Sequence, residues 1–271
     1  MLQKLKKGIA ILTIIVLLPY IITIFIHGNG AKESHKEEKN EFLNEYCIGL
    51  LAKEVSSDYE EEMLKVQALL VRTTVYQKIK EQGIEKIREE YQNSKEEISP
   101  GWRQKLKRIW EDTDGQVIMY QDQLALVPFH QVSNGKTRTA SEVLGSEEYP
   151  YLQTKECPKD VEADKQMASK FIEIKGVKIV ASDSVGYVTE VSLGEETVSG
   201  ENFRDTYKLA SSCFELQEFS GNTRVTTKGV GHGLGLSQYT ANEMAKEGKT
   251  YKEILQYFFE GTEIKEVAEI L

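Results

Sequence analysis

The chain opens with an almost unbroken run of apolar residues, Ile9 to Ile26, preceded by three lysines. Its length is close to the roughly 20 helical residues that cross a bilayer, and it is apolar on every face, as a membrane span is. No small-x-small cleavage triplet follows it, which favours an uncleaved anchor over a cleaved signal peptide. We predict a transmembrane signal-anchor at 9–27, with residues 1–8 in the cytoplasm because the lysines precede the span.

A polar spacer follows the apolar run. Lys32 to Glu41 contains no apolar residue and mixes both signs of charge, which is typical of a solvated segment. We therefore predict a charged linker at 28–41 and one domain at 42–271. A single-pass protein of the cell membrane with an extracytoplasmic C-terminal domain is the expected arrangement.

From Glu41 to Val55 the pattern of apolar positions becomes helical. Leu43, Cys47, Leu50 and Glu54 follow one another at helical steps, so Glu54 is predicted to continue an apolar stripe. A carboxyl in such a place loses hydration, which raises its pKa and suits it to donate a proton. The pattern alone favours a structural alternative, a buried salt bridge that Arg72 would complete.

The pattern predicts further helices before the middle of the chain. Asp58 and Glu61 have capping-box spacing ahead of a second helix at about 59–82. Residues 84–113 are expected to be helical with a break near 99–101.

Strands are predicted to dominate the middle, and helices the end. The expected strands are 116–120 and 124–129, paired as a hairpin, then 171–180, 185–193 and 224–230. Ser237 is placed to cap a helix that ends at Gly248, and Thr250 with Glu253 forms a capping box. We therefore predict a single external α+β domain with N-terminal helices, a central antiparallel or mixed β region and C-terminal helices.

Charge and cysteine content exclude some classes of protein. The formal net charge is −9, whereas nucleic-acid binding needs a cationic surface. Cys47, Cys157 and Cys213 form no C-x-x-C pair, so they indicate neither a disulfide framework nor a cysteine zinc site. One disulfide plus a free thiol remains open.

The stretch KGVGHGLGLSQY, residues 228–239, has glycine at alternate positions. It matches neither phosphate-binding glycine pattern, and His232 has no second histidine at zinc-helix spacing. Two interpretations stay open. The glycines could expose backbone amides to a ligand beside a helix N-terminus, or they could form a tight strand-to-helix turn with His232 as a core residue.

Four blocks of the chain occur in the order found in one known family. Residues 48–76, IGLLAKEVSSDYEEEMLKVQALLVRTTVY, are similar to G-x-x-A-x-E-M-P followed by K-A-Q-A-x-x-x-R-T. FHQVSNGKT (129–137) resembles F-H-S-T-x-G-G-x-T, and VSGENFRDTY (198–207) fits V-x-G-x-x-F-R. Residues 228–264 resemble a closing block that begins G-x-G-H-G-V-G-M-S-Q-Y-G-A. Together they resemble the stage II sporulation protein D family.

This resemblance implies an exported lytic transglycosylase that cuts peptidoglycan glycan strands during engulfment in spore formers. The family's catalytic glutamate, in A-x-E-M-P, matches Glu54, although Val55-Ser56 replaces Met-Pro. Some members bind zinc through cysteines near the middle block. Here that block has no cysteine, so we predict no metal; a zinc site stays open as the alternative, in which Cys157 would return to His130.

The implied chemistry needs a single acid. Glu54 protonates the glycosidic oxygen and then, as a carboxylate, takes the proton of the muramyl C6 hydroxyl, which attacks C1 and leaves a 1,6-anhydro sugar. Asp58 remains available as a second carboxylate, which keeps hydrolysis open. The other residues expected to contact glycan are Gln67, Arg72, His130, Ser133, His232, Ser237, Gln238 and Tyr239. Fold maintenance is the alternative for each of them.

The expected partners follow from that chemistry. They are peptidoglycan glycan strands, the membrane through the N-terminal helix, and other cell-wall hydrolases of sporulation. A non-catalytic peptidoglycan-binding or scaffold protein of the sporulation septum is the alternative, since a chain can keep an enzyme's fold without its activity.

Overall fold

The computed structural model describes residues 41–93 and 97–267. The chain divides into two compact units, Met1–Cys47 and Ile48–Leu271, and the residues of the candidate site belong to the second. The expected cytoplasmic segment, the anchor at 9–27 and nearly all of the expected linker lie outside the described residues. Within the described ranges, no helix is long and apolar enough to span a bilayer.

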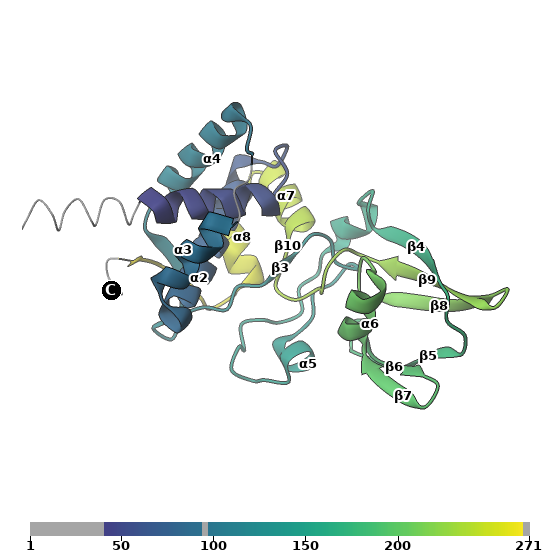
Figure 1. Ribbon diagram of the computed structural model, residues 1–271. Helices are drawn as coiled ribbons and strands as arrows, with labels where there is room; N and C mark the ends of the chain where they lie inside the picture. Colours follow the sequence, from purple (N-terminus) through teal and green to yellow (C-terminus); the bar gives the residue numbers. More distant parts are fainter. Residues whose placement is uncertain (1–40, 94–96, 268–271) are drawn as a thin grey trace, which may run out of the picture. The chain divides into compact units, whose positions relative to one another are not determined.

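The helices lie mainly in the first and last parts of the chain (Figure 1). Residues 41–54 are helical. The others are α2 (Glu61–Gln82), α3 (Ile84–Asn93), α4 (Pro100–Asp112), α5 (Ala140–Leu144), α6 (Gly200–Tyr207), α7 (Gln238–Lys246) and α8 (Tyr251–Phe258), with a 3-10 turn η1 (Pro158–Glu162). The capping predictions hold at the end of the chain, because Ser237 caps α7 and Thr250 forms a capping box with Glu253 on α8. Asp58 forms no such box: α2 starts after Glu60, which caps it with no side-chain hydrogen bond.

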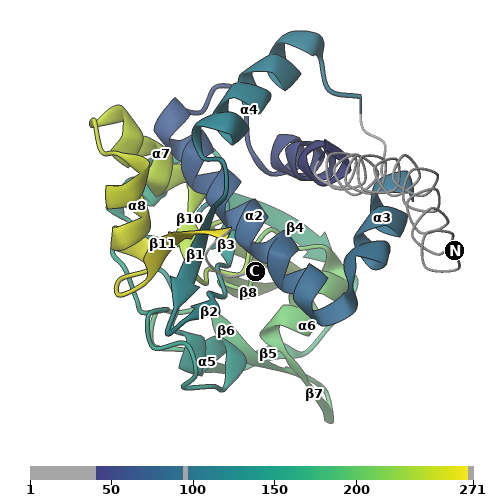
Figure 2. The same cartoon turned by 90° about the vertical axis from the view of Figure 1, so that its left-hand side faces the viewer.

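Helix α2 is the centre of the helical region. Its residues between Met63 and Val75 are buried on nearly all sides, and it packs against α4, α7, α8 and β1. Figure 2 shows α2 running beside β1. A helix that is apolar around most of its circumference must be covered on several sides, and here helices and a small sheet supply that cover.

The strands of the described residues form four small sheets. The strands are β1 (Gln116–Tyr120), β2 (Gln123–Leu124), β3 (Phe129–His130), β4 (Met167–Ile172), β5 (Val177–Ser182), β6 (Val188–Leu193), β7 (Glu196–Ser199), β8 (Phe214–Phe219), β9 (Asn222–Lys228), β10 (Leu236–Ser237) and β11 (Glu263–Glu266). Their orders are β11-β1-β2, β10-β3, β4-β9-β8 and β5-β6-β7. The α+β class is therefore confirmed, with antiparallel pairing in all sheets except β10-β3.

Two expected strands are wrong. Residues 124–129 were expected to form one strand, but β2 ends at Leu124 and β3 begins at Phe129. Residues 171–180 were expected to be continuous, but the chain turns at Gly176, where φ is +70°. The two halves become β4 and β5, which belong to different sheets. Apolar residues on both sides of the glycine gave one continuous pattern, and the turn between them is short.

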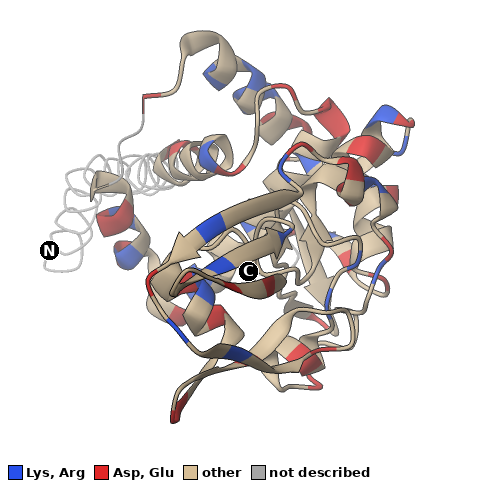
Figure 3. Ribbon diagram, turned by 90° about the vertical axis from the view of Figure 1, so that its right-hand side faces the viewer, with Lys and Arg blue, Asp and Glu red and all other residues tan. Residues whose placement is uncertain are grey.

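Figure 3 shows the strand-rich side, where basic and acidic residues are interspersed.

The strand-rich region has its own hydrophobic core. Ile172, Val191, Phe203, Phe214 and Val225 are buried together there. The helical region has another, built from α2, α7, α8 and the segments around 118–127 and 234–236. The parallel pair β10-β3 matters most for the site, because its register sets Ser237 opposite His130 and so brings two sequence blocks side by side.

Candidate active site

Glu54 stands in the last turn of helix 41–54, and its side chain is exposed. The prediction that it continues the buried stripe is therefore wrong: Leu51 and Val55 face the core in its place. Loss of hydration nevertheless raises the pKa of Glu54, against the opposing charge of Lys53. No ion pair joins Glu54 to Arg72 in the described part of the chain, so the carboxyl is not neutralised by the salt bridge considered above.

The main chain at Glu54 is held by Gln238, the first residue of α7. Gln238 Nε2 donates to the Glu54 carbonyl oxygen at 2.8 Å and to Gln67 Oε1 at 3.1 Å. Both glutamines are buried. Two of the predicted glycan contacts are thus brought together with Glu54, but through its backbone. The Gln67 Nε2 atom is buried and lacks a hydrogen-bond partner among the described residues.

The segment after Glu54 is fixed at further points. Asn242, one turn along α7 from Gln238, accepts a hydrogen bond from Glu60 N at 2.8 Å. From α4, Lys105 Nζ donates to the carbonyls of Ser57 and Tyr59 at 3.3 Å each. The loop that carries Glu54 into α2 is therefore clamped by α7 and α4. Sequence reasoning missed Asn242, whose spacing of four residues from Gln238 was the available signal.

Asp160 is the centre of the second part of the site. It is fully buried and accepts hydrogen bonds from Ser133 N (2.6 Å), Ser237 Oγ (2.7 Å) and Thr240 Oγ1 (2.6 Å). The predicted residues Ser133 and Ser237 are both fully buried. Their polar groups are engaged inside the protein, which matches the alternative of fold maintenance. No sequence pattern marked Asp160, because its partners lie far from it along the chain.

The two predicted histidines lie close together, with ring centroids 6.0 Å apart. Burial lowers the pKa of His130 to about 3 and also lowers that of His232. His232 Nδ1 accepts a hydrogen bond from Leu234 N at 3.0 Å, and His130 Nδ1 lies 3.2 Å from Leu234 O. Both rings are therefore mainly neutral near pH 7 and are poor proton donors. Among the predicted residues, Glu54 is the better acid.

Each of the four alternating glycines has a positive φ and is packed against another part of the protein. A Cβ at Gly229 would lie 2.6 Å from Val132 O, and one at Gly231 would lie 2.7 Å from His130 Cβ. At Gly233 it would overlap the ring of Tyr187, and at Gly235 the Pro128 carbonyl. The partner that approaches this backbone is thus the protein itself. The packing of these glycines matches the tight turn of the two interpretations left open by the sequence, but His232 is half-buried and is not a core residue.

Arg138 joins the glycine-rich segment to the strand-rich region. Its side chain is buried, donates to Asp183 and Glu201, and also bonds the His232 carbonyl at 3.0 Å. The guanidinium also lies 4.8 Å from the centre of the Tyr187 ring. Arg138 directly follows the FHQVSNGKT block, and that position was the only sequence signal for it.

Arg72 and Tyr239 differ in their surroundings. The Arg72 guanidinium donates to the carbonyls of Trp110, Thr113 and Gln116, and stacks on the Trp110 ring at 3.7 Å. It therefore binds the C-terminal end of α4, as a cation suits a helix C-terminus. Tyr239 is half-buried, and its N–H donates to Gln131 O at 3.0 Å.

Cys157 is the cysteine that the sequence left open as a partner for His130. Cys157 lies beside Asp160, Thr240 and Ser133, and burial raises the pKa of its thiol to about 12. Over 41–93 and 97–267, no cluster of three or more His, Cys, Asp or Glu side chains is placed to hold a metal. Cys157 and Cys213 are both free thiols.

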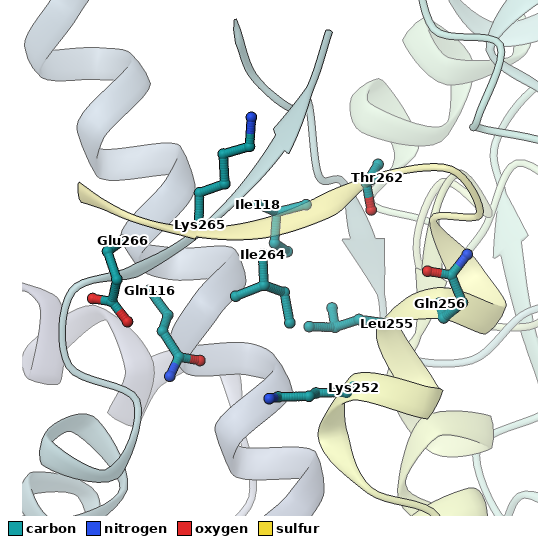
Figure 4. Close-up of a pocket in the computed structure, with 9 residues that line it drawn as sticks. All are labelled: Gln116, Ile118, Lys252, Leu255, Gln256, Thr262, Ile264, Lys265 and Glu266. Atoms are coloured by element: carbon teal, nitrogen blue, oxygen red, sulfur yellow. The ribbon is translucent and has the colours of Figure 1, made fainter. Parts of the chain in front are cut away.

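A cavity of about 440 Å³ lies elsewhere in the fold (Figure 4). Residues of β1, α8 and β11 line it, among them Ile118, Leu255 and Ile264 on an apolar wall and Lys252 beside them. None of the predicted site residues borders it. It therefore adds nothing to the arrangement around Glu54.

These features define an α+β protein in which a glutamate with an exposed carboxyl of raised pKa is held, through its main chain, by a helix of the glycine- and histidine-containing block. A family model described as stage II sporulation protein matches residues 32–120. The chain is 32% identical over 267 residues to stage II sporulation protein D of Bacillus subtilis (strain 168), covering 87% of this chain and 78% of that protein. It therefore belongs to the stage II sporulation protein D family, as the sequence blocks predicted.

Two further relatives extend the comparison. Stage II sporulation protein D of Bacillus amyloliquefaciens is 29% identical over 272 residues, which cover 89% of this chain and 79% of that protein. A protein named amidase enhancer, from Bacillus subtilis (strain 168), is 37% identical over 60 residues, which are 22% of this chain and 8% of that protein. Family membership supports a role related to sporulation.

Proposed function

We propose that this protein is a membrane-anchored peptidoglycan lytic transglycosylase that acts during sporulation, with Glu54 as its single acid and base. The observation that carries the proposal is the state of Glu54. Its carboxyl is exposed, so a glycan can reach it, and its pKa is raised by lost hydration, so it carries a proton at higher pH than an ordinary glutamate. The membership of the chain in a sporulation family supplies the setting.

The reaction needs only one group that first gives and then takes a proton. Protonated Glu54 donates its proton to the glycosidic oxygen as the bond from muramyl C1 to that oxygen breaks. The resulting carboxylate then accepts the proton of the C6 hydroxyl as its oxygen bonds to C1. Glu54 ends protonated, no water is consumed, and the product carries a 1,6-anhydro ring.

The remaining predicted residues divide by what their side chains are free to do. Gln238 and Gln67 hold the main chain at Glu54. Tyr239 and His232 are half-buried and keep some surface for contact with sugar. His130, Ser133, Ser237 and Arg72 are buried, and we assign them to maintaining the arrangement.

The test compares Glu54 and Glu60, which stand at the two ends of the loop between helix 41–54 and α2. The full chain and its Glu54→Gln variant would be purified in detergent, incubated with glycan strands, and the products weighed by mass spectrometry. We expect the variant to lose about 10²- to 10⁴-fold in cleavage rate, the range for removal of a general acid. Glu60→Gln is the matched control, because Glu60 is also exposed. Equal rates for Glu54→Gln and the native chain would exclude Glu54 as the acid.

One observation favours hydrolysis as a second candidate. A hydrogen bond from Ser56 lowers the pKa of Asp58, whereas the pKa of Glu54 is raised. Two carboxyls whose pKa values move apart are suited to act as an acid and a base. Hydrolysis would leave reducing ends, and Asp58→Asn would then abolish cleavage; the single-acid mechanism leaves anhydro ends and tolerates this substitution. Wall binding with no cleavage at all would support the non-catalytic scaffold.

A further inference from the structure

The sheet β4-β9-β8 has two faces of very different character. Ile172, Val225 and Phe214 point into the core of the strand-rich region. On the opposite face, Phe171 and Phe219 are exposed by 56% and 60%. We call this opposite side the outer sheet face and define it by Phe171, Phe219, Met167, Arg224 and Gln217, which the register and the alternation of side chains place together.

The exposed aromatic rings on this face form a pair. Phe171 on β4 and Phe219 on β8 have ring centroids 6.0 Å apart at an interplanar angle of 56°. Met167, at the start of β4, is exposed by 63%. Large apolar side chains gathered on a solvent-facing surface commonly mark a binding site.

A cation lies between the two outer strands. Arg224 on β9 pairs in register with Phe171 on one side and Gln217 on the other. It donates to Ser169 Oγ at 3.2 Å, and no ion pair involves it within 41–93 and 97–267. The neighbouring Lys228 is already paired with Glu215 at 2.7 Å. Arg224 is thus the cation of this face that is free to bind an anion.

We propose that the outer sheet face binds peptidoglycan at a second, non-catalytic site, with sugar rings stacked on Phe171 and Phe219 and a stem-peptide carboxylate on Arg224. A pyranose has an apolar C–H face and a rim of hydroxyls, which fits single aromatic rings bordered by Gln217 and Ser169. The face is exposed to solvent, so peptide branches can leave it outwards. This inference rests on the proposed action on peptidoglycan.

Charge argues against a second copy of this chain as the occupant. A two-fold interface through this face would use the same patch twice and would therefore bury Arg224 of both copies, which forms no ion pair among the described residues. A ligand with neutral sugars and carboxylates complements the pair of aromatic rings and the neighbouring Arg224.

The test measures binding of the full chain, in detergent, to purified intact peptidoglycan by co-sedimentation. All forms carry Glu54→Gln so that the wall is not cleaved. The double variant Phe171→Ser/Phe219→Ser is expected to bind at least about tenfold more weakly, which is about 1.4 kcal/mol. Ile179→Ser/Val180→Ser is the matched control, because those exposed apolar residues lie on β5 in a different sheet. Thermal unfolding of each form confirms that it is folded.

Further arms separate the alternatives. Arg224→Gln is expected to weaken binding about threefold to intact wall, with Lys178→Gln on β5 as its control. Equal binding by the native and Phe-substituted faces would overturn the proposal. So would tighter binding to glycan stripped of its peptides, or a change from dimer to monomer on Phe substitution in sedimentation velocity. Failure of cleavage by the native chain would remove the proposed function and leave this binding result standing.

Discussion

The carboxyls of Glu54 and Asp160 lie in the same candidate site but in opposite settings. Asp160 is fully buried and accepts three hydrogen bonds, two of them from hydroxyls of the α7 start. The Glu54 carboxyl is exposed, and no hydrogen bond to it is present in the described part of the chain. Gln238, which directly follows Ser237, joins the two by its bond to the Glu54 carbonyl.

This difference indicates how the work is divided. A carboxyl whose oxygens are occupied inside the protein stabilises an arrangement, because its partners would otherwise be buried and unbonded. A carboxyl that is held only by its backbone keeps its oxygens for a substrate. The start of α7 is therefore fixed from the inside by Asp160 and in turn fixes the position of Glu54.

The largest expected effect comes from removing the buried carboxyl. Asp160→Ala leaves three buried donors without an acceptor, at about 1–3 kcal/mol each, so we expect the free energy of unfolding to fall by about 3 kcal/mol or more. Denaturant unfolding measures it. Asp164→Ala, at an exposed position of the same segment, should stay within about 0.5 kcal/mol of the native chain. A change in cleavage rate with unchanged stability would contradict a purely structural role for Asp160.

An intermediate effect is expected at the connection. Gln238→Ala removes the bond to the Glu54 carbonyl, and a shift of the carboxyl should lower kcat by about 10- to 100-fold with little change in KM. Asn242→Ala is the comparison, since it loosens the same loop at Glu60, further from Glu54, and should lower kcat less. If both variants lose stability and neither loses kcat, the bond from Gln238 does not position Glu54.

The smallest effect is a change in pH dependence alone. Glu54 must be protonated to act as the acid, so kcat/KM should fall as pH rises through its raised pKa. The charge of Lys53 lowers that pKa. Lys53→Gln should therefore move the alkaline limb of kcat/KM to higher pH and leave stability nearly unchanged. An unmoved or acid-shifted limb would show that Glu54 is not the group that titrates.

The sequence predicted those parts of the fold that depend on neighbouring residues. The helix at 41–54, strand β1, the break before α4 and the caps Ser237 and Thr250 follow from local periodicity and capping. The burial of Glu54 was predicted wrongly. Leu51 and Val55 are the buried positions of this turn, so the apolar stripe does not continue to Glu54. That choice depends on tertiary contacts, which periodicity does not contain.

The sequence indicated some of the residues that lie near Glu54, but not what each side chain contacts. Glu54, Gln67 and Gln238 come together as the sequence blocks imply. Asp160 could not be found, because a single aspartate in a loop carries no pattern and its partners lie 27, 77 and 80 residues away. Arg72 was expected near Glu54 or sugar, and its bonds to the end of α4 could not be read from spacing.

The alternating glycines of 229–235 bear on how such proteins are recognised. Each of these positions needs a residue without a side chain, because protein atoms fill the space where its Cβ would be. Any chain that folds this segment in the same way therefore needs glycine at the same positions, whether or not it retains an acid at the position of Glu54. The glycine pattern of 229–235 therefore indicates that a chain shares this fold. Whether that chain cleaves glycan has to be tested separately.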